Sequence, residues 1–460
     1  MKKRSTDALL AGWAVRDITP DRPASLRGQM HVRISTHART PLTVTALALE
    51  GPGADGRLHQ ALFLSCDRAA AEEELIAGVR EVLRGKLPEF DPSMLIMTGT
   101  HTHSAPVANE GMYPPQGPEI MTPTEYMSFS VARAADAAVE AWKNRKPAAV
   151  TSAYGHAVVA HNRRAVYFDG SAKMYGRTND ENFDCIEGYT DHSVDMLFLW
   201  DDARKLTGVV VNVPCPSQTE ESSTYISADY WHETREELKR RLGSDIFVLA
   251  QCGAAGDQSP HPLLYGDIEN HMRERRGITE QQDIAARIAD AVEHAFHTAQ
   301  EHAGPGLPFM HFVRTLKLPF HKVTKRDADW ARKELKTLQS RKDWWAENLQ
   351  GVVERYKVQG KKMLCEPCEL HVLRVGGVAL ATNPYELYLD YGLRVKARSK
   401  AGQTIVVNLA GPGGYLPTEK AVKGGSYSGS AASFLVAPEG GHMLVCHTLE
   451  MIDGMWKDTQ

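Results

Sequence analysis

The sequence predicts an α/β protein in which mixed β-sheets are flanked by helices. Short runs rich in β-branched and apolar residues alternate with longer amphipathic runs up to about residue 302. Hydrophobic residues make up 42% of the 460 residues and charged residues 24%, which is ordinary for a globular protein with a sizeable core.

Each expected strand is a short apolar segment bounded by turn-forming residues. The strands expected before residue 302 are 42–50, 60–66, 93–99, 148–160, 193–200, 206–213 and 245–251. Each expected helix has apolar residues at helical spacing and charged residues on the opposite face. These helices are 71–87, 128–145, 231–243 and 278–302.

The stretch 304–308, with sequence GPGLP, marks a possible lobe boundary. After it we expect strand 309–319 and a charged segment, 326–357, that forms a helical hairpin. Three tryptophans in this hairpin are expected to pack onto the body of the protein, with a substrate lid as the alternative. Strands 369–382 and 404–410 follow, with a helix between them. We therefore expect residues 1–460 to form one domain.

Composition excludes several classes of function. Lys and Arg number 53 and Asp and Glu 57, a net charge of −4, which gives no support to nucleic-acid binding. No apolar run reaches the roughly 18 residues that a membrane span needs. The basic N-terminus has a short apolar stretch broken by Asp7, so we expect no signal peptide and a cytoplasmic location, with secretion still open. Oligomeric state is left open.

Seven scattered cysteines do not form the pattern of a disulfide framework, which favours a reducing compartment. Cys365 and Cys368 have C-x-x-C spacing, but no second pair follows to complete a zinc site. The 19 histidines are more unusual and point to metal or acid–base chemistry.

The segment Thr98–Pro106 is the first candidate for such chemistry. It contains His101 and His103 directly after strand 93–99. If the backbone stays extended, the two rings point the same way and can face a metal ion. A polar loop with a capping or core histidine is the alternative.

Ser259 lies in the glycine-rich stretch GAAGDQSP, where it can act as a nucleophile or an oxyanion donor, although turn formation alone explains the residues. Arg163 follows a strand and can bind an anionic intermediate or form a surface charge pair. Glu386 can be a metal ligand, but Asn383, Pro384 and Glu386 also fit a helix start with a capping box.

Two tyrosines complete the set of candidates. Tyr415 and Tyr427 lie in glycine-flanked loops twelve residues apart, where packing is the default role. The order of the motifs is more informative than any one of them. GTHTHSAP, then N-R, SADY, GAAGDQSP, PYE and GYLPT follow one another in an order that resembles the neutral, non-lysosomal ceramidase family. The resemblance spans nearly the whole chain, from RDITP at 16–20 to about residue 450.

The resemblance implies a zinc-dependent amidase with a ceramidase-type catalytic domain that cleaves the N-acyl bond of ceramide. It implies that His101, Glu386 and Tyr415 are zinc ligands. The residues that it implies for the substrate and the reaction are His103, Arg163, Ser259 and Tyr427. GTHTHS and GAAGDQSP are the most specific matches. The chain ends soon after the tyrosine segment, so no C-terminal immunoglobulin-like domain is expected.

One zinc ligand of the family is missing. Its second histidine lies in an A-V-H-P-T-S context, and this chain has Pro214 and Cys215 there. Cys215 is the expected replacement because a thiolate binds zinc well. A register shift that supplies His232 and a weakened metal site are the alternatives.

The sequence thus predicts a zinc-dependent hydrolase of an N-acyl amide, with a lipid or small-molecule amide as substrate. A hydrolase of a small soluble amide or ester on the same fold is one alternative. A non-catalytic binding protein with a degenerate metal site is the other.

Overall fold

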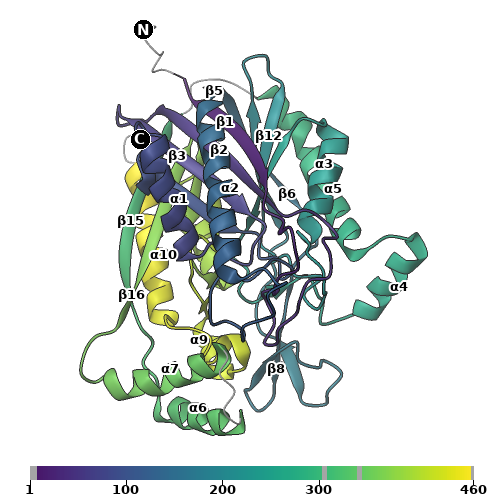
Figure 1. Ribbon diagram of the computed structural model, residues 1–460, viewed down its shortest axis with the longest axis vertical. Coiled ribbons are helices and arrows are strands. Elements are labelled where there is room, and N and C mark those ends of the chain that lie inside the picture. Colours follow the sequence, from purple (N-terminus) through teal and green to yellow (C-terminus); the bar gives the residue numbers. More distant parts are fainter. Residues whose placement is uncertain (1–7, 303–307, 339–343, 457–460) are drawn as a thin grey trace.

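The computed structural model describes residues 8–302, 308–338 and 344–456, and three larger sheets organise this part of the chain (Figure 1). The first sheet has the strand order β4-β3-β2-β1-β5. Its strands are β1 (Leu10–Asp17), β2 (Thr43–Pro52), β3 (Leu58–Cys66), β4 (Leu95–Gly99) and β5 (Lys146–Pro147). β3 and β4 run parallel, whereas the other pairs are antiparallel.

The other two larger sheets have the orders β13-β12-β11-β6 and β15-β16-β17-β19. The strands of the second sheet are β6 (Ala149–His156), β11 (Ser193–Trp200), β12 (Leu206–Val213) and β13 (Phe247–Cys252). Those of the third are β15 (Phe309–Pro319), β16 (Cys365–Val375), β17 (Val378–Thr382) and β19 (Gln403–Val407). Each sheet combines parallel and antiparallel pairs, which confirms the predicted mixed sheets.

Helices cover the outer faces of the sheets (Figure 1). The first sheet carries α1 (Glu73–Lys86) and α2 (Pro123–Lys143), the second α3 (Tyr230–Leu242) and α5 (Glu280–Glu301), and the third α8 (Leu389–Arg398) and α10 (Pro438–Met455). α2 and α5 begin with capping boxes at Thr122 and Thr279. In each box the threonine hydroxyl accepts a hydrogen bond from the backbone amide three residues later, and the side chain of that residue accepts one from the threonine amide.

The sheets share one core. Side chains from all three pack together there, including Trp13, Phe63, Leu197, Phe309 and Ile405. Hydrogen bonds also connect the sheets. The Ser65 hydroxyl donates to the Ala250 carbonyl, and the side-chain amide of Asn212 donates to the Val406 carbonyl. Strands on both sides of the 304–308 stretch contribute to this core, while residues 303–307 lie outside the described ones.

The charged segment forms the predicted hairpin within its described residues, as α6 (Lys325–Thr337) and α7 (Trp344–Val358); residues 339–343 lie outside them. Trp330 and Trp345 pack against a cluster that includes Ala431 and Ala432, as the packing interpretation predicts. The predicted strand 369–382 is instead two strands, because Gly376, with φ of 59°, turns the chain between β16 and β17.

Several elements were not predicted, including the longer β1 and α10. The helical ones are η1 (Pro92–Met94), α4 (Gly266–Arg276), α9 (Glu419–Gly424) and η2 (Tyr427–Gly429). The short strands are β7 (His161–Asn162), β8 (Arg164–Tyr167), β9 (Ala172–Met174), β10 (Phe183–Ile186), β14 (Gln258–Ser259), β18 (Glu386–Leu387) and β20 (Tyr415–Leu416). All seven cysteines are described and free, as expected. Among the described residues, no helix is both long and apolar enough to cross a membrane.

Candidate active site

Two small sheets bring the sequence motifs together. β18 and β20 pair in parallel so that Glu386 lies opposite Tyr415. β7 and β14 pair so that Ser259 lies opposite His161, and Arg163 directly follows β7. The GAAGDQSP, NR, PYE and GYLPT motifs are therefore joined by backbone pairing between segments far apart in the chain.

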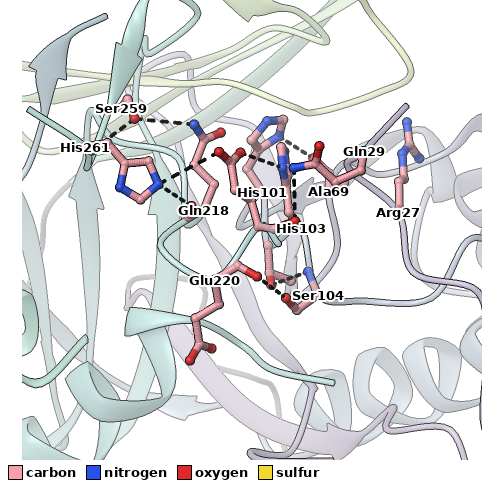
Figure 2. A network of polar contacts seen from close by, with 12 residues as sticks. Arg27, Gln29, Ala69, His101, His103, Ser104, Gln218, Glu220, Ser259 and His261 are labelled. Atoms are coloured by element: carbon pink, nitrogen blue, oxygen red, sulfur yellow. Dashed lines mark hydrogen bonds and ion pairs between the residues drawn. The ribbon is translucent and has the colours of Figure 1, made fainter. Parts of the chain in front are cut away.

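His101 is the first residue of the site, and its backbone is not extended. It has φ of 69°, in the left-handed region that non-glycine residues rarely adopt, so the assumption of an extended H-x-H segment is wrong. The rings of His101 and His103 still lie near each other, with centroids 5.0 Å apart. His101 Nδ1 bonds to the Ala69 carbonyl at 2.7 Å (Figure 2), which leaves Nε2 3.6 Å from Glu386 Oε2.

The His101 ring is neutral. Burial lowers its pKa well below the ordinary value, and His103 and Arg163 lower it further. A neutral imidazole with one nitrogen bonded to a backbone carbonyl and the other directed at a carboxylate has the arrangement of a metal-ligating histidine.

Glu386 lies in β18, and the helix-start interpretation of residues 383–386 is wrong. α8 begins at Leu389, and the Asn383 side chain accepts a bond from the Tyr385 amide at 3.1 Å instead of capping a helix. Burial raises the pKa of Glu386, while Arg163 and a hydrogen bond from Tyr415 oppose the rise.

Arg163 supplies a buried cation beside this carboxylate. Its Nη2 donates to the Tyr415 hydroxyl at 3.2 Å and to the Gly256 carbonyl at 3.0 Å, and its Nε has no hydrogen-bond partner among the described residues. Although burial alone would lower the pKa of Arg163, Tyr415, Tyr175 and Glu386 raise it well above the ordinary value. The guanidinium therefore stays charged.

Tyr427 joins the site through aromatic contacts. Its ring lies 5.6 Å from that of Tyr415, in a T-shaped contact, and 5.7 Å from that of Trp345 on α7. The hairpin thus reaches a predicted site residue as well as packing on the body of the protein. Burial raises the pKa of Tyr427, so the phenol keeps its proton.

Ser259 is fully buried, and its contacts give it no general base. Its Oγ bonds to the Tyr175 hydroxyl at 2.9 Å, lies 3.5 Å from the Gln218 amide and accepts a bond from the His261 backbone at 3.1 Å. Among the described residues, no imidazole or carboxylate forms a hydrogen bond with Ser259 Oγ. This environment suits a hydrogen-bonding or positioning role better than a nucleophilic one.

His101, Glu386 and Tyr415 together can hold a metal ion. A catalytic zinc site commonly has three protein ligands and an open position. A cavity of about 10 Å³, lined by His101, Pro216, Cys252 and Glu386 among others, has room for about one water molecule or ion. Among the described residues, no group of three His, Cys, Asp or Glu side chains is arranged for a metal ion. Tyr415 lies opposite Glu386 and is the third candidate ligand, but it does not line the cavity.

Cys215 does not line that cavity. Its Sγ lies 3.5 Å from the Pro216 carbonyl and 3.9 Å from that of Val159, and burial raises the pKa of the thiol well above its ordinary value. His232 lies in the first turn of α3 and does not line the cavity either. Tyr415 is absent from the lining as well, so His101 and Glu386 are the predicted ligands that line the cavity.

Sequence reasoning missed several residues around the site. Tyr175, with φ of 53°, accepts a bond from Gln218 Nε2 at 2.8 Å and contacts Arg163. Glu221 lies beside His103, with Oε2 3.4 Å from Nδ1. Asp257 of the GAAGDQSP motif accepts bonds from the Asn162 side chain and the Leu389 amide, both at 2.9 Å. Only Asp257 lay in a motif that the sequence had singled out.

Comparison with known proteins gives matches only at the level of structure. A scan against protein-family models and a search of curated proteins both find no match. A solved structure described as a ceramidase complexed with C2 superposes with a TM-score of 0.70 at 14% identity, covering 97% of this chain and 75% of that one. The neutral ceramidase from Pseudomonas aeruginosa gives the same TM-score and identity, covering 97% and 74%. The chain therefore has a neutral ceramidase-like fold.

Proposed function

We propose that the protein is a zinc-dependent hydrolase that cleaves an N-acyl amide bond, as a ceramidase does. The observation that carries the proposal is the convergence of His101, Glu386 and Tyr415 beside the charged Arg163, in a chain with this fold. A zinc ion held by the first three residues supplies a Lewis acid that polarises a carbonyl and activates water.

The chain's own residues supply the rest of the chemistry. Arg163 keeps its charge and has an unpartnered Nε, so it suits the stabilisation of an oxyanion, and the protonated hydroxyl of Tyr427 suits the same task. In this proposal His103 accepts a proton from water and returns it to the leaving amine. Ser259 holds Tyr175 and Gln218 in place.

The test is hydrolysis of N-acyl sphingosines and of short soluble N-acyl amides by the purified protein. We expect a chelator to remove activity and zinc to restore it, with metal analysis showing about one zinc per chain. His101→Ala is expected to lose at least about 10³-fold in kcat/KM. Full activity in this variant would contradict the proposal. A rate that rises with acyl-chain length supports a lipid amide, whereas a flat or falling rate favours a small soluble one.

A non-catalytic binding protein is the second candidate, because the Cys215 thiol does not line the cavity of the predicted metal ligands. This candidate predicts no tightly bound metal, no hydrolysis after zinc is added, and saturable binding of the amide. Bound zinc together with turnover would eliminate it.

A further inference from the structure

The ring and backbone of His103 are fixed by neighbouring residues, although His103 lies in a loop. The backbone of Gly28 lies against it: a Cβ at position 28 would be 2.4 Å from Cγ and 2.7 Å from Nδ1 of His103. Gly28 also has φ of 113°, which favours glycine. Arg33 Nη2 donates to the His103 carbonyl, so both the backbone and the ring are fixed. Figure 2 shows this ring next to that of His101.

The His103 ring also lies beside the carboxylate of Glu221. Glu221 Oε2 lies 3.4 Å from His103 Nδ1, a buried nitrogen that has no closer hydrogen-bond partner among the described residues. Glu221 Oε1 lies 4.0 Å from His261 Nε2, which bonds to the Gln218 carbonyl at 3.1 Å. The carboxylate therefore lies between two imidazoles.

Glu221 is ionised in this position. Burial alone would raise its pKa, but His103, His261 and Arg163 lower it below the ordinary value. Asp229 anchors the segment, since it accepts bonds from the Thr219 hydroxyl at 2.7 Å and the Glu220 amide at 2.9 Å. The neighbouring Glu220 side chain is directed away from the histidines (Figure 2) and bonds to Arg39, Tyr225 and Ser227.

We propose that Glu221 is a positioning residue for the hydrolytic reaction, on the condition that the proposed function holds. Its carboxylate, 3.4 Å from Nδ1, holds a proton of the His103 ring on that nitrogen. The opposite nitrogen, Nε2, then presents its lone pair to the reacting atoms. Such a carboxylate–imidazole pair fixes both the orientation and the tautomer of a general base.

The proton balance is simple. His103 Nε2 takes a proton from the attacking water as its oxygen bonds to the amide carbon, and Glu221 stabilises the imidazolium that forms. The same proton passes from Nε2 to the amine nitrogen as the C–N bond breaks, which restores neutral His103. The 3.4 Å contact is long for a hydrogen bond, and such contacts tighten when substrate binds.

The test compares Glu221→Gln and Glu221→Asp with the matched control Glu220→Gln. We expect Glu221→Gln to lose about 10²-fold in kcat with little change in KM, and Glu221→Asp to recover part of the loss. Glu220→Gln is expected to lower Tm and keep kcat, since its carboxylate bonds only to structural partners.

A second readout needs no turnover. Histidine labelled with ¹⁵N in the ring reports the tautomer of each imidazole, and His103→Gln identifies the signal of His103. We expect Nδ1–H in the wild type and a shift toward Nε2–H in Glu221→Gln. An unchanged tautomer and an unchanged kcat would overturn the proposal. If the wild type hydrolyses no amide, the proposed function fails, while the tautomer still decides whether Glu221 positions His103.

Discussion

Two clusters of buried histidines differ in how completely their polar atoms are hydrogen-bonded. Between β3, β15 and β16, His59 bonds to Asp55 and to the His311 amide, and His311 bonds to the Gln60 carbonyl and to His371 at 3.0 Å. His371 then reaches Glu369 at 2.9 Å, so every ring nitrogen has a partner.

At the candidate site, by contrast, His103 Nδ1 and Arg163 Nε are buried with no hydrogen-bond partner in the part of the chain that the structure describes, and His101 Nε2 is 3.6 Å from Glu386. Buried polar groups left open are costly and rarely kept without a reason. The comparison teaches that these two clusters differ in how completely their polar atoms are bonded, and not in histidine content.

Two neighbouring arginines give the sharpest test of this contrast. Arg163→Met is expected to lose about 10²–10³-fold in kcat with a small change in Tm, because it removes a charge from the site. Arg164 instead bonds to Glu187, Ser428 and the carbonyls of Ala421 and Gly425. Kinetics and thermal unfolding measure both effects.

The matched Arg164→Met variant is expected to lose about 3–5 kcal/mol of unfolding free energy, since it leaves Glu187 buried and unpaired. If its folded fraction has lower kcat than Arg163→Met, the assignment of the two arginines is wrong.

The closed histidine network is expected to contribute to stability and not to turnover. His371→Gln removes a partner from His311 or Glu369 and is expected to cost about 1–3 kcal/mol of unfolding free energy. Urea denaturation measures the cost. A kcat reduced tenfold at 25 °C, where the variant is folded, would place this network in the mechanism instead.

Acid is expected to weaken the protein through the same network. Burial and the neighbouring His371 lower the pKa of His311 from 6.5 to about 3. Below about pH 6.5, His311 is protonated in the unfolded chain but stays neutral in the folded protein. This difference lowers the free energy of unfolding by about 1.4 kcal/mol per pH unit as the pH falls toward the folded pKa. Urea denaturation between pH 7 and 4 checks the slope, which is expected to be about one proton smaller in His311→Asn.

The smallest effect is expected at Cys215. Cys215→Ala is expected to bind zinc as the wild type does and to lose only about 1 kcal/mol of stability, because the thiol contacts backbone carbonyls and does not line the cavity. Metal titration measures the affinity. A tenfold or larger loss of zinc affinity would show that this thiol completes the metal site.

Periodicity was enough to predict most of the larger strands and helices, since each carries its own apolar pattern. It missed short strands such as β18 and β20, because two residues have no period and their pairing is a tertiary event. The interpretation of Asn383 and Glu386 as a helix start was wrong for the same reason. These residues could cap a helix locally, but the pairing of Glu386 with Tyr415 determines the backbone conformation.

Motif order indicated His101, Glu386, Arg163 and Tyr415, which the structure brings together. The sequence did not indicate Glu221 or Gln218, because a carboxylate or an amide in a polar loop cannot be distinguished from a solvent-exposed side chain by sequence alone. The role inferred for Glu221 comes from the distance to His103, which depends on how the loop at Asp229 meets the loop at Gly28.

The carboxylate of Asp257 has a consequence for how the candidate site assembles. It ties Asn162, next to Arg163, to the amide that starts α8, just after Glu386. The segments joined in this way are separated by 95 and 132 positions along the chain. No contiguous fragment of the second or third sheet holds the candidate site, so a test of the proposed hydrolysis also reports whether these segments have docked.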